Sequence, residues 1–198
     1  MVKSGLVNQP DVSHYRLTVH LGVAVLILGG LLWAALDLMI RRTKAAAPGL
    51  RHGANCLLGI IFLQILTGGL VAGLNAGFIY NSFPMMNQYW FPPELWDLSP
   101  FWVNMLENVV TVQFDHRIGA YVCVILTSWL WWRCRASNLS PNVRTALNLV
   151  LSAMFLQFAL GIATLLWVVP VPIAVLHQGG ALLLFAAAVY LSFRLHRG

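Results

Sequence analysis

The sequence predicts an all-α, polytopic membrane protein with five transmembrane helices. Of its 198 residues, 59% are hydrophobic and only 9% are charged, whereas an ordinary soluble domain contains about 25% charged residues. Five apolar stretches reach the roughly 20 residues that a helix needs to cross a bilayer. These stretches lie at about 17–40, 54–76, 110–132, 146–168 and 173–195.

The distribution of cations predicts how these helices are oriented. Nine of the twelve Lys and Arg residues lie in segment 41–52, in segment 133–145 or near the C-terminus, and the other three are Lys3, Arg16 and Arg117. By the positive-inside rule, segments 41–52 and 133–145 and the C-terminus lie in the cytoplasm or matrix, and the loop 77–109 lies on the opposite, outer side. The formal net charge of +6 therefore reflects membrane orientation and does not indicate nucleic-acid binding.

Three histidines share one depth in this topology. The three helices that run from outside to inside each carry a histidine near their outer end, namely His20, His116 and His177. Ionisable side chains inside a membrane are costly and indicate function. A pair such as His116 and His177 on facing helices suits axial ligation of a haem iron. The alternative is two interfacial histidines that bond only to backbone or water.

A weak internal repeat predicts the domain organisation. FLQILTGG at 62–69 resembles FLQFALGI at 155–162, and the residues around His20 resemble those around His177. Residues 51–198 are therefore expected to form a four-helix transmembrane bundle with an external loop at 77–109. Residues 1–50, with a helix at about 17–40, are expected to be the remnant of a preceding similar bundle. The chain then reads as the C-terminal portion of a longer protein or as the product of a late start.

The predicted external loop 77–109 is rich in aromatic residues and proline. Trp and Tyr favour the membrane interface, and four prolines argue against one continuous helix. A long loop inside a compact bundle is commonly functional, so we expect a packed lid. An interfacial anchor without a chemical role is the alternative.

Five stretches of the chain carry a family resemblance: MVKSGL, VSHYRLTVHLG, GLVAGLNAGFIYNSFPMMN, ENVVTVQFDHR and LGIATLLWVVPVPIAVLHQGGAL. They cover nearly all of the chain, and together they resemble the haem A synthase family. The loop has no cysteine pair, so the chain resembles the type found in alphaproteobacteria and mitochondria and not the branch with a loop disulfide.

The resemblance implies eight transmembrane helices in two similar bundles, each offering two histidines to a haem. His116 and His177 would hold the iron of a b-type haem in the C-terminal bundle, and His20 would be a possible ligand of the substrate haem. The partner of His20 and the family's Glu-x-x-His-Arg motif are absent from this chain. Gln113 stands three residues before His116, where that motif has its glutamate.

The activity implied by the resemblance is oxidation of a methyl group of haem O to a formyl group, which makes haem A for cytochrome oxidase. The catalytic residues would then lie mainly before Met1, and this chain alone could be inactive. Expected partners are haem O, haem O synthase, an electron donor, the lipid bilayer and a second copy of the chain. The expected location is the bacterial inner membrane or, in a eukaryote, the mitochondrial inner membrane. The alternative function is a membrane b-type cytochrome that transfers electrons without synthase activity.

Other polar residues near the predicted site have two interpretations each. Arg117 could bind a haem propionate, because guanidinium matches a carboxylate bidentately, or it could contact lipid headgroups. Glu107 is expected to stabilise a helix N-terminus, with substrate or proton handling as the alternative. Gln64 and Gln157 are expected to join helices by hydrogen bonds inside the bundle.

Overall fold

The computed structural model describes residues 13–40, 48–135 and 137–197. The MVKSGL motif and the cations Lys3, Arg41, Arg42 and Lys44 lie outside these residues. No β-strand occurs in the described parts of the chain, and five of their helices are long and apolar enough to cross a membrane. The prediction of an all-α, multi-pass membrane protein is confirmed.

The five long helices begin or end a few residues away from the predicted positions. The largest differences are at α2 and α5, which begin six and five residues earlier than expected, because Pro48 and Pro141 are tolerated in a first helical turn. At α5, the Ser140 side chain also accepts a hydrogen bond from the Val143 backbone N–H. The bounds are α1 His14–Met39, α2 Pro48–Gly73, α4 Val109–Arg135, α5 Pro141–Leu166 and α6 Val171–Arg197.

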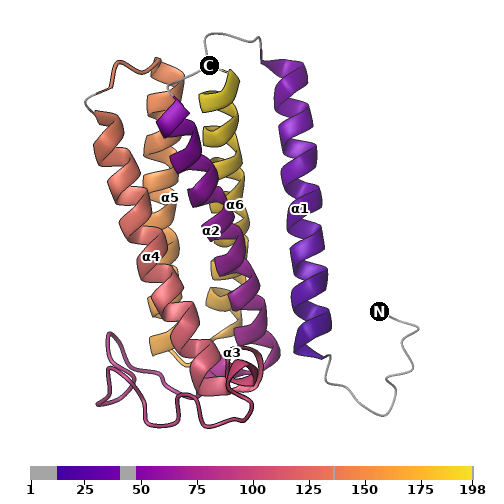
Figure 1. The fold of residues 1–198 in the computed structure, drawn as a ribbon, viewed down its shortest axis with the longest axis vertical. Helices are drawn as coiled ribbons and strands as arrows, with labels where there is room; N and C mark the ends of the chain where they lie inside the picture. Colours follow the sequence, from indigo (N-terminus) through magenta and orange to yellow (C-terminus); the bar gives the residue numbers. More distant parts are fainter. Residues whose placement is uncertain (1–12, 41–47, 136, 198) are drawn as a thin grey trace.

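Four of these helices form a closed ring, and α1 lies outside it (Figure 1). Helix α2 packs on α4 and α6, and α5 packs on the same two helices. Helices α4 and α6 therefore face each other across one diagonal of the bundle, and α2 and α5 face each other across the second. Helix α1 packs against α2 and α6.

The segment between α2 and α4 folds under one end of this ring (Figure 1). It contains two short 3-10 helices, η2 Ala76–Phe78 and η3 Phe101–Val103, and one turn of helix, α3 Asn104–Glu107. Tyr80, Met86 and Leu95 bury their side chains in it. Tyr80 donates a hydrogen bond to Glu94 Oε2 at 2.9 Å, and its burial together with this bond raises the pKa of Tyr80, so the phenol stays a donor. These contacts hold part of the loop, but most of its aromatic side chains, such as Trp90, Phe91 and Trp102, are exposed. The packed lid therefore stays a prediction.

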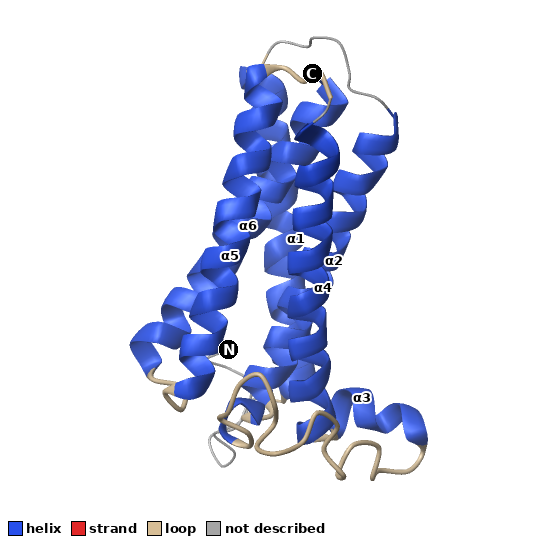
Figure 2. Ribbon diagram, turned by 90° about the vertical axis from the view of Figure 1, so that its left-hand side faces the viewer, coloured by secondary structure: helices blue, strands red, loops and turns tan. Residues whose placement is uncertain are grey.

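The apolar core fills only one half of the bundle. Its members lie at the end where α4 and α6 finish and α5 begins, and they include Leu57, Val150, Leu191 and Leu195. Toward the loop the bundle has no fully buried residue in three stretches: 114–122 of α4, 155–166 of α5 and 171–183 of α6. At this end α5 and α6 diverge from α2 and α4 (Figure 2). The sequence did not predict this difference between the two halves.

Candidate haem site

His116 lies two turns into α4 and is held by two side chains of α2. The Gln64 amide nitrogen donates a hydrogen bond to the His116 carbonyl oxygen at 2.8 Å and lies 3.1 Å from Nδ1 of the ring. The same nitrogen is 3.5 Å from the ring Nε2, beyond the normal hydrogen-bond range. Thr67 places its hydroxyl 2.8 Å from Nδ1 and 2.9 Å from the Gln64 carbonyl oxygen. The ring orientation of His116 is therefore fixed from α2.

His177 lies in the second turn of α6 and has an equivalent support from α5. The Gln157 amide nitrogen donates to the His177 carbonyl oxygen at 2.7 Å and lies 3.0 Å from Nδ1. The internal repeat seen in the sequence thus places one glutamine against one histidine in each helix pair. Gln64 and Gln157 do join helices, as expected, and they also orient the two imidazoles.

Four glycines make these contacts sterically possible. A Cβ at Gly68 would lie 3.3 Å from Cε1 of His116, and one at Gly161 would lie 3.0 Å from Cε1 of His177. A Cβ at Gly119 or Gly180 would collide with the amide oxygen of Gln64 or Gln157, respectively. In each helix pair, one glycine therefore lies next to the imidazole ring and a second glycine lies next to the glutamine amide.

A haem fits the residues present at this end of the bundle. His116 and His177 lie on the diagonal helices α4 and α6. The surrounding stretches of α4, α5 and α6 contain no fully buried residue. Gln157 also has a buried amide oxygen without a hydrogen-bond partner. Two imidazoles in fixed orientations on diagonal helices are the kind of nitrogen ligands that a haem iron takes.

Arg117 is directed to the loop and not into the bundle interior. Its terminal nitrogens donate to the carbonyl oxygens of Tyr80 at 2.8 Å and Ser82 at 2.9 Å. Gln113 supports the same segment by donating to the Ala76 and Tyr80 carbonyl oxygens. Only Nε of Arg117 is buried without a partner. The contact between Arg117 and a haem propionate stays a prediction. Arg117 would have to make it with a guanidinium group that already donates hydrogen bonds to the loop.

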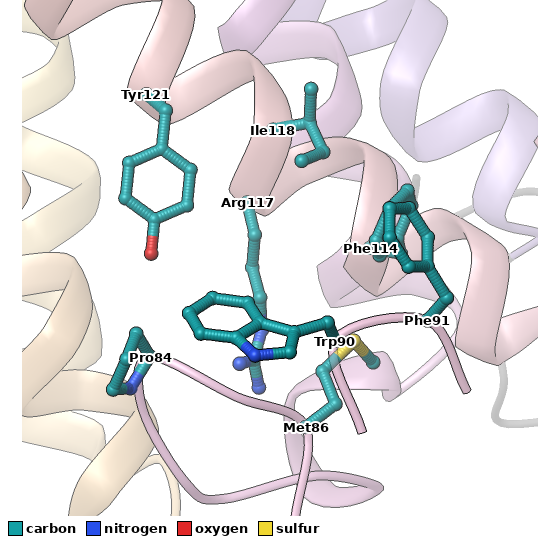
Figure 3. A pocket seen from close by; sticks show the side chains of 8 residues that line it. All are labelled: Pro84, Met86, Trp90, Phe91, Phe114, Arg117, Ile118 and Tyr121. Atoms are coloured by element: carbon teal, nitrogen blue, oxygen red, sulfur yellow. The ribbon is translucent and has the colours of Figure 1, made fainter.

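The outer face of this part of α4 carries a small aromatic pocket of about 190 Å³ (Figure 3). Phe114, Ile118 and Tyr121 line it from α4, and Trp90 and Phe91 line it from the loop. His116 is two residues from both Phe114 and Ile118, which on a helix is a rotation of about 200°. The pocket is therefore on the side of α4 opposite to the histidine site.

His20 lies on the outward face of α1. The inward face packs through Thr18 on Gly69 and through Gly22 on Leu66. His20 is two residues, or a rotation of about 200°, from both Thr18 and Gly22, and it is exposed. The structure therefore does not bring His20 together with His116 and His177, and a role as ligand of a substrate haem stays a prediction.

Glu107 does not cap α4, contrary to the expectation from the sequence. The cap is Asn108, whose side-chain oxygen accepts from the backbone N–H groups of Val110 at 2.9 Å and Thr111 at 3.2 Å. Glu107 instead accepts a hydrogen bond from Tyr15 and lies 3.6 Å from Nε2 of His14. This cluster joins the start of α1 to the loop. Sequence reasoning missed it, because the partners are 92 residues apart.

Comparison with known proteins agrees with this architecture. The family model COX15-CtaA, described as a cytochrome oxidase assembly protein, matches residues 1–189. The chain belongs to this family. Relatives named Heme A synthase from Nitrosospira multiformis and Parvibaculum lavamentivorans are 47% and 42% identical over 100% and 98% of the chain. Heme A synthase COX15 from Bos taurus is 40% identical over the whole chain.

The chain spans about half the length of these relatives, from 50% of the Bos taurus protein to 56% of the two bacterial ones. No solved structure matches the chain significantly. The resemblance to haem A synthases found in the sequence is confirmed at the level of the family. The roles of individual residues stay predictions.

Proposed function

We propose that the chain serves in a haem A synthase, which oxidises a methyl group of haem O to a formyl group, and that His116 and His177 hold a b-type haem. The names of the relatives support the activity. The observation that supports the haem site is the paired arrangement of glutamine and histidine on α2/α4 and α5/α6. It sets two imidazoles on diagonal helices at the end of the bundle that lies outside the apolar core.

The bound haem would supply one-electron redox chemistry. His116 and His177 would supply nitrogen ligands to its iron, and the hydrogen bonds of Gln64 and Gln157 would hold these imidazoles in place. With two histidine ligands, such a haem would suit electron transfer better than binding of oxygen. Oxidation of the substrate is assigned to residues outside this site.

Haem ligation is tested with His116→Ala and His177→Ala in protein purified from membranes. We expect each variant to lose most of its bound haem, measured as the ratio of haem absorbance to protein. His52→Ala, at the far end of the bundle, is the control and should keep a normal haem content. Normal haem in both ligand variants would rule out this pair.

Synthase activity is tested by expressing the chain beside a source of haem O and separating the extracted haems by chromatography. Haem A in the extract supports the proposed function. The second candidate, a b-type cytochrome, is favoured by the presence of Gln113 instead of an acidic residue near His116. Because oxidation of the substrate is assigned to residues outside this site, the same test is made with the chain joined to the N-terminal half of a relative such as the Nitrosospira multiformis protein. If that protein carries b-type haem but forms no haem A, the second candidate is supported.

A further inference from the structure

The two histidines differ in one contact that the repeat does not reproduce. Thr67 contacts Nδ1 of His116, whereas the equivalent position of α5, three residues after Gln157, is Leu160. His177 therefore has an amide beside its Nδ1 but no hydroxyl. The glutamine–histidine hydrogen bonds and the glycines next to them are the same in both helix pairs, so the Thr67 hydroxyl distinguishes the two histidines.

The hydrogen bonds of Thr67 indicate which ring nitrogen of His116 carries the proton. A threonine hydroxyl has one proton, and in helices it is commonly donated to a carbonyl one turn earlier. Here that acceptor is the Gln64 carbonyl oxygen at 2.9 Å. The hydroxyl oxygen is then left to accept from Nδ1–H of His116 at 2.8 Å. With its proton on Nδ1, the neutral ring has a free lone pair on Nε2, which is the form that binds a metal.

His177 meets a different acceptor. The Gln157 nitrogen, like the Gln64 nitrogen beside His116, is an amide donor and cannot accept a proton from Nδ1. The acceptor at the His177 ring is the main-chain carbonyl group of Gln157. His116 therefore uses a side-chain hydroxyl where His177 uses the backbone.

We infer that Thr67 is a positioning residue whose hydroxyl holds Nδ1–H of His116 and so makes this histidine a stronger electron donor to the haem iron. The inference rests on the proposed haem site. A hydrogen bond from Nδ1–H to an acceptor raises the basicity of a histidine ligand. A more basic axial ligand favours ferric over ferrous iron, so second-shell hydrogen bonds of this kind tune the reduction potential.

The test compares Thr67→Val, which removes the hydroxyl at nearly constant size, with Thr67→Ser, which keeps it. Haem content and the midpoint potential are measured on the whole chain purified with its haem. We expect Thr67→Val to raise the ferrous-to-ferric ratio about tenfold at a fixed potential, a shift of about 59 mV for one electron. Thr67→Ser should keep the wild-type potential. Leu160→Thr, the matched change beside His177, should leave the potential near the wild-type value, because the Gln157 main-chain carbonyl already accepts from that ring.

The outcomes separate the hydroxyl from plain packing. Loss of haem in Thr67→Val with normal haem in Thr67→Ser would also support the inference, because only the hydroxyl distinguishes them. Equal loss of haem in both would overturn it, as would an unchanged potential in Thr67→Val at normal haem content. Failure of the haem site itself would be recognised separately, by normal haem content in His116→Ala.

Discussion

The helix pairs α2/α4 and α5/α6 are built on the same plan and supported differently. Each sets a glutamine against the Nδ1 and carbonyl oxygen of a histidine, with a glycine beneath the ring. In α2/α4 a threonine hydroxyl is added to the histidine, and the following arginine holds the loop. In α5/α6 neither addition exists. The shared plan places the two imidazoles, and the additions make their environments unequal.

The segments that connect the two helices of each pair also differ. The segment between α2 and α4 is long and has its own buried side chains, and Gln113 and Arg117 of α4 bond to its carbonyl groups. The connection from α5 to α6 is a turn of a few residues in which Val168 and Val169 adopt φ values of 59° and 57°. Helix α4 is thus hydrogen-bonded to the long segment that connects it to α2. Helices α5 and α6 are connected by a short turn with two valines in the left-handed conformation.

The shared plan is tested most strongly at the glycines that face the glutamine amides. We expect Gly119→Val to displace the Gln64 amide from His116 and Gly180→Val to displace the Gln157 amide from His177. Overpacking and the loss of a buried hydrogen bond together amount to about 3 kcal/mol in the free energy of unfolding. Thermal unfolding in detergent and haem content measure the effect.

Gly179→Ala is the control for this prediction. A Cβ at Gly179 meets nothing within 4 Å, and alanine favours a helix over glycine by about 1 kcal/mol. We expect this variant to be as stable as the wild type or slightly more stable. If Gly119→Val and Gly180→Val behave like Gly179→Ala, the amide contacts do not hold the two pairs together.

The unequal support of the histidines is tested by Gln157→Leu and Gln64→Leu. Loss of a second-shell partner of a metal ligand commonly costs about 10- to 100-fold in affinity. We expect Gln157→Leu near the upper end of that range, because it removes the one side chain that bonds to His177. Gln64→Leu should lie near the lower end, because Thr67 still contacts His116. Haem titration of the apoprotein gives both affinities, and equal losses would contradict the comparison.

The sequence predicted the shared plan better than the additions. Apolar length predicted the five helices, the distribution of cations predicted that His20, His116 and His177 share one depth, and the repeat matched Gln64 with Gln157. These signals are local or periodic, so they can be read without knowing the fold. The residues that make the pairs unequal carry no such pattern.

Thr67 and Arg117 show why those additions could not be predicted. A threonine in an apolar helix is compatible with plain packing, and its role depends on a histidine 49 residues away. Arg117 was expected at a propionate or a headgroup, and the carbonyl groups that it binds belong to an irregular loop. The geometry of such a loop follows from tertiary contacts and not from a repeat.

The loop contacts are tested by Arg117→Leu. The variant removes charge-assisted hydrogen bonds to the carbonyl groups of Tyr80 and Ser82, and each bond to a charged group contributes about 2 kcal/mol. We expect faster hydrogen exchange of the amides in segment 80–88 and a smaller increase at the α5–α6 turn, because Asn81 donates to the Leu165 carbonyl oxygen. Arg144→Leu, an exposed position on α5, is the matched control. Equal exchange rates in the two variants would mean that Arg117 does not hold the loop.

The smallest effect is expected at the strained turn between α5 and α6. Val168 has a φ of 59°, a left-handed conformation that disfavours a β-branched residue and that asparagine tolerates. Its side chain is about half exposed, so little packing is lost on replacement. We expect Val168→Asn to increase the free energy of unfolding by about 1 kcal/mol through relief of this strain.

Thermal unfolding of Val168→Asn, with Val171→Asn as the exposed control at the start of α6, measures this gain. The control lies where the backbone is helical, so asparagine relieves no strain there and should leave stability equal or lower. A stabilised turn with unchanged haem content would show that the strain is a local cost of connecting two helices that both carry part of the site. A stabilised turn with altered haem content would show instead that the short connection helps to set the position of His177, as the long loop does for the helix that carries His116.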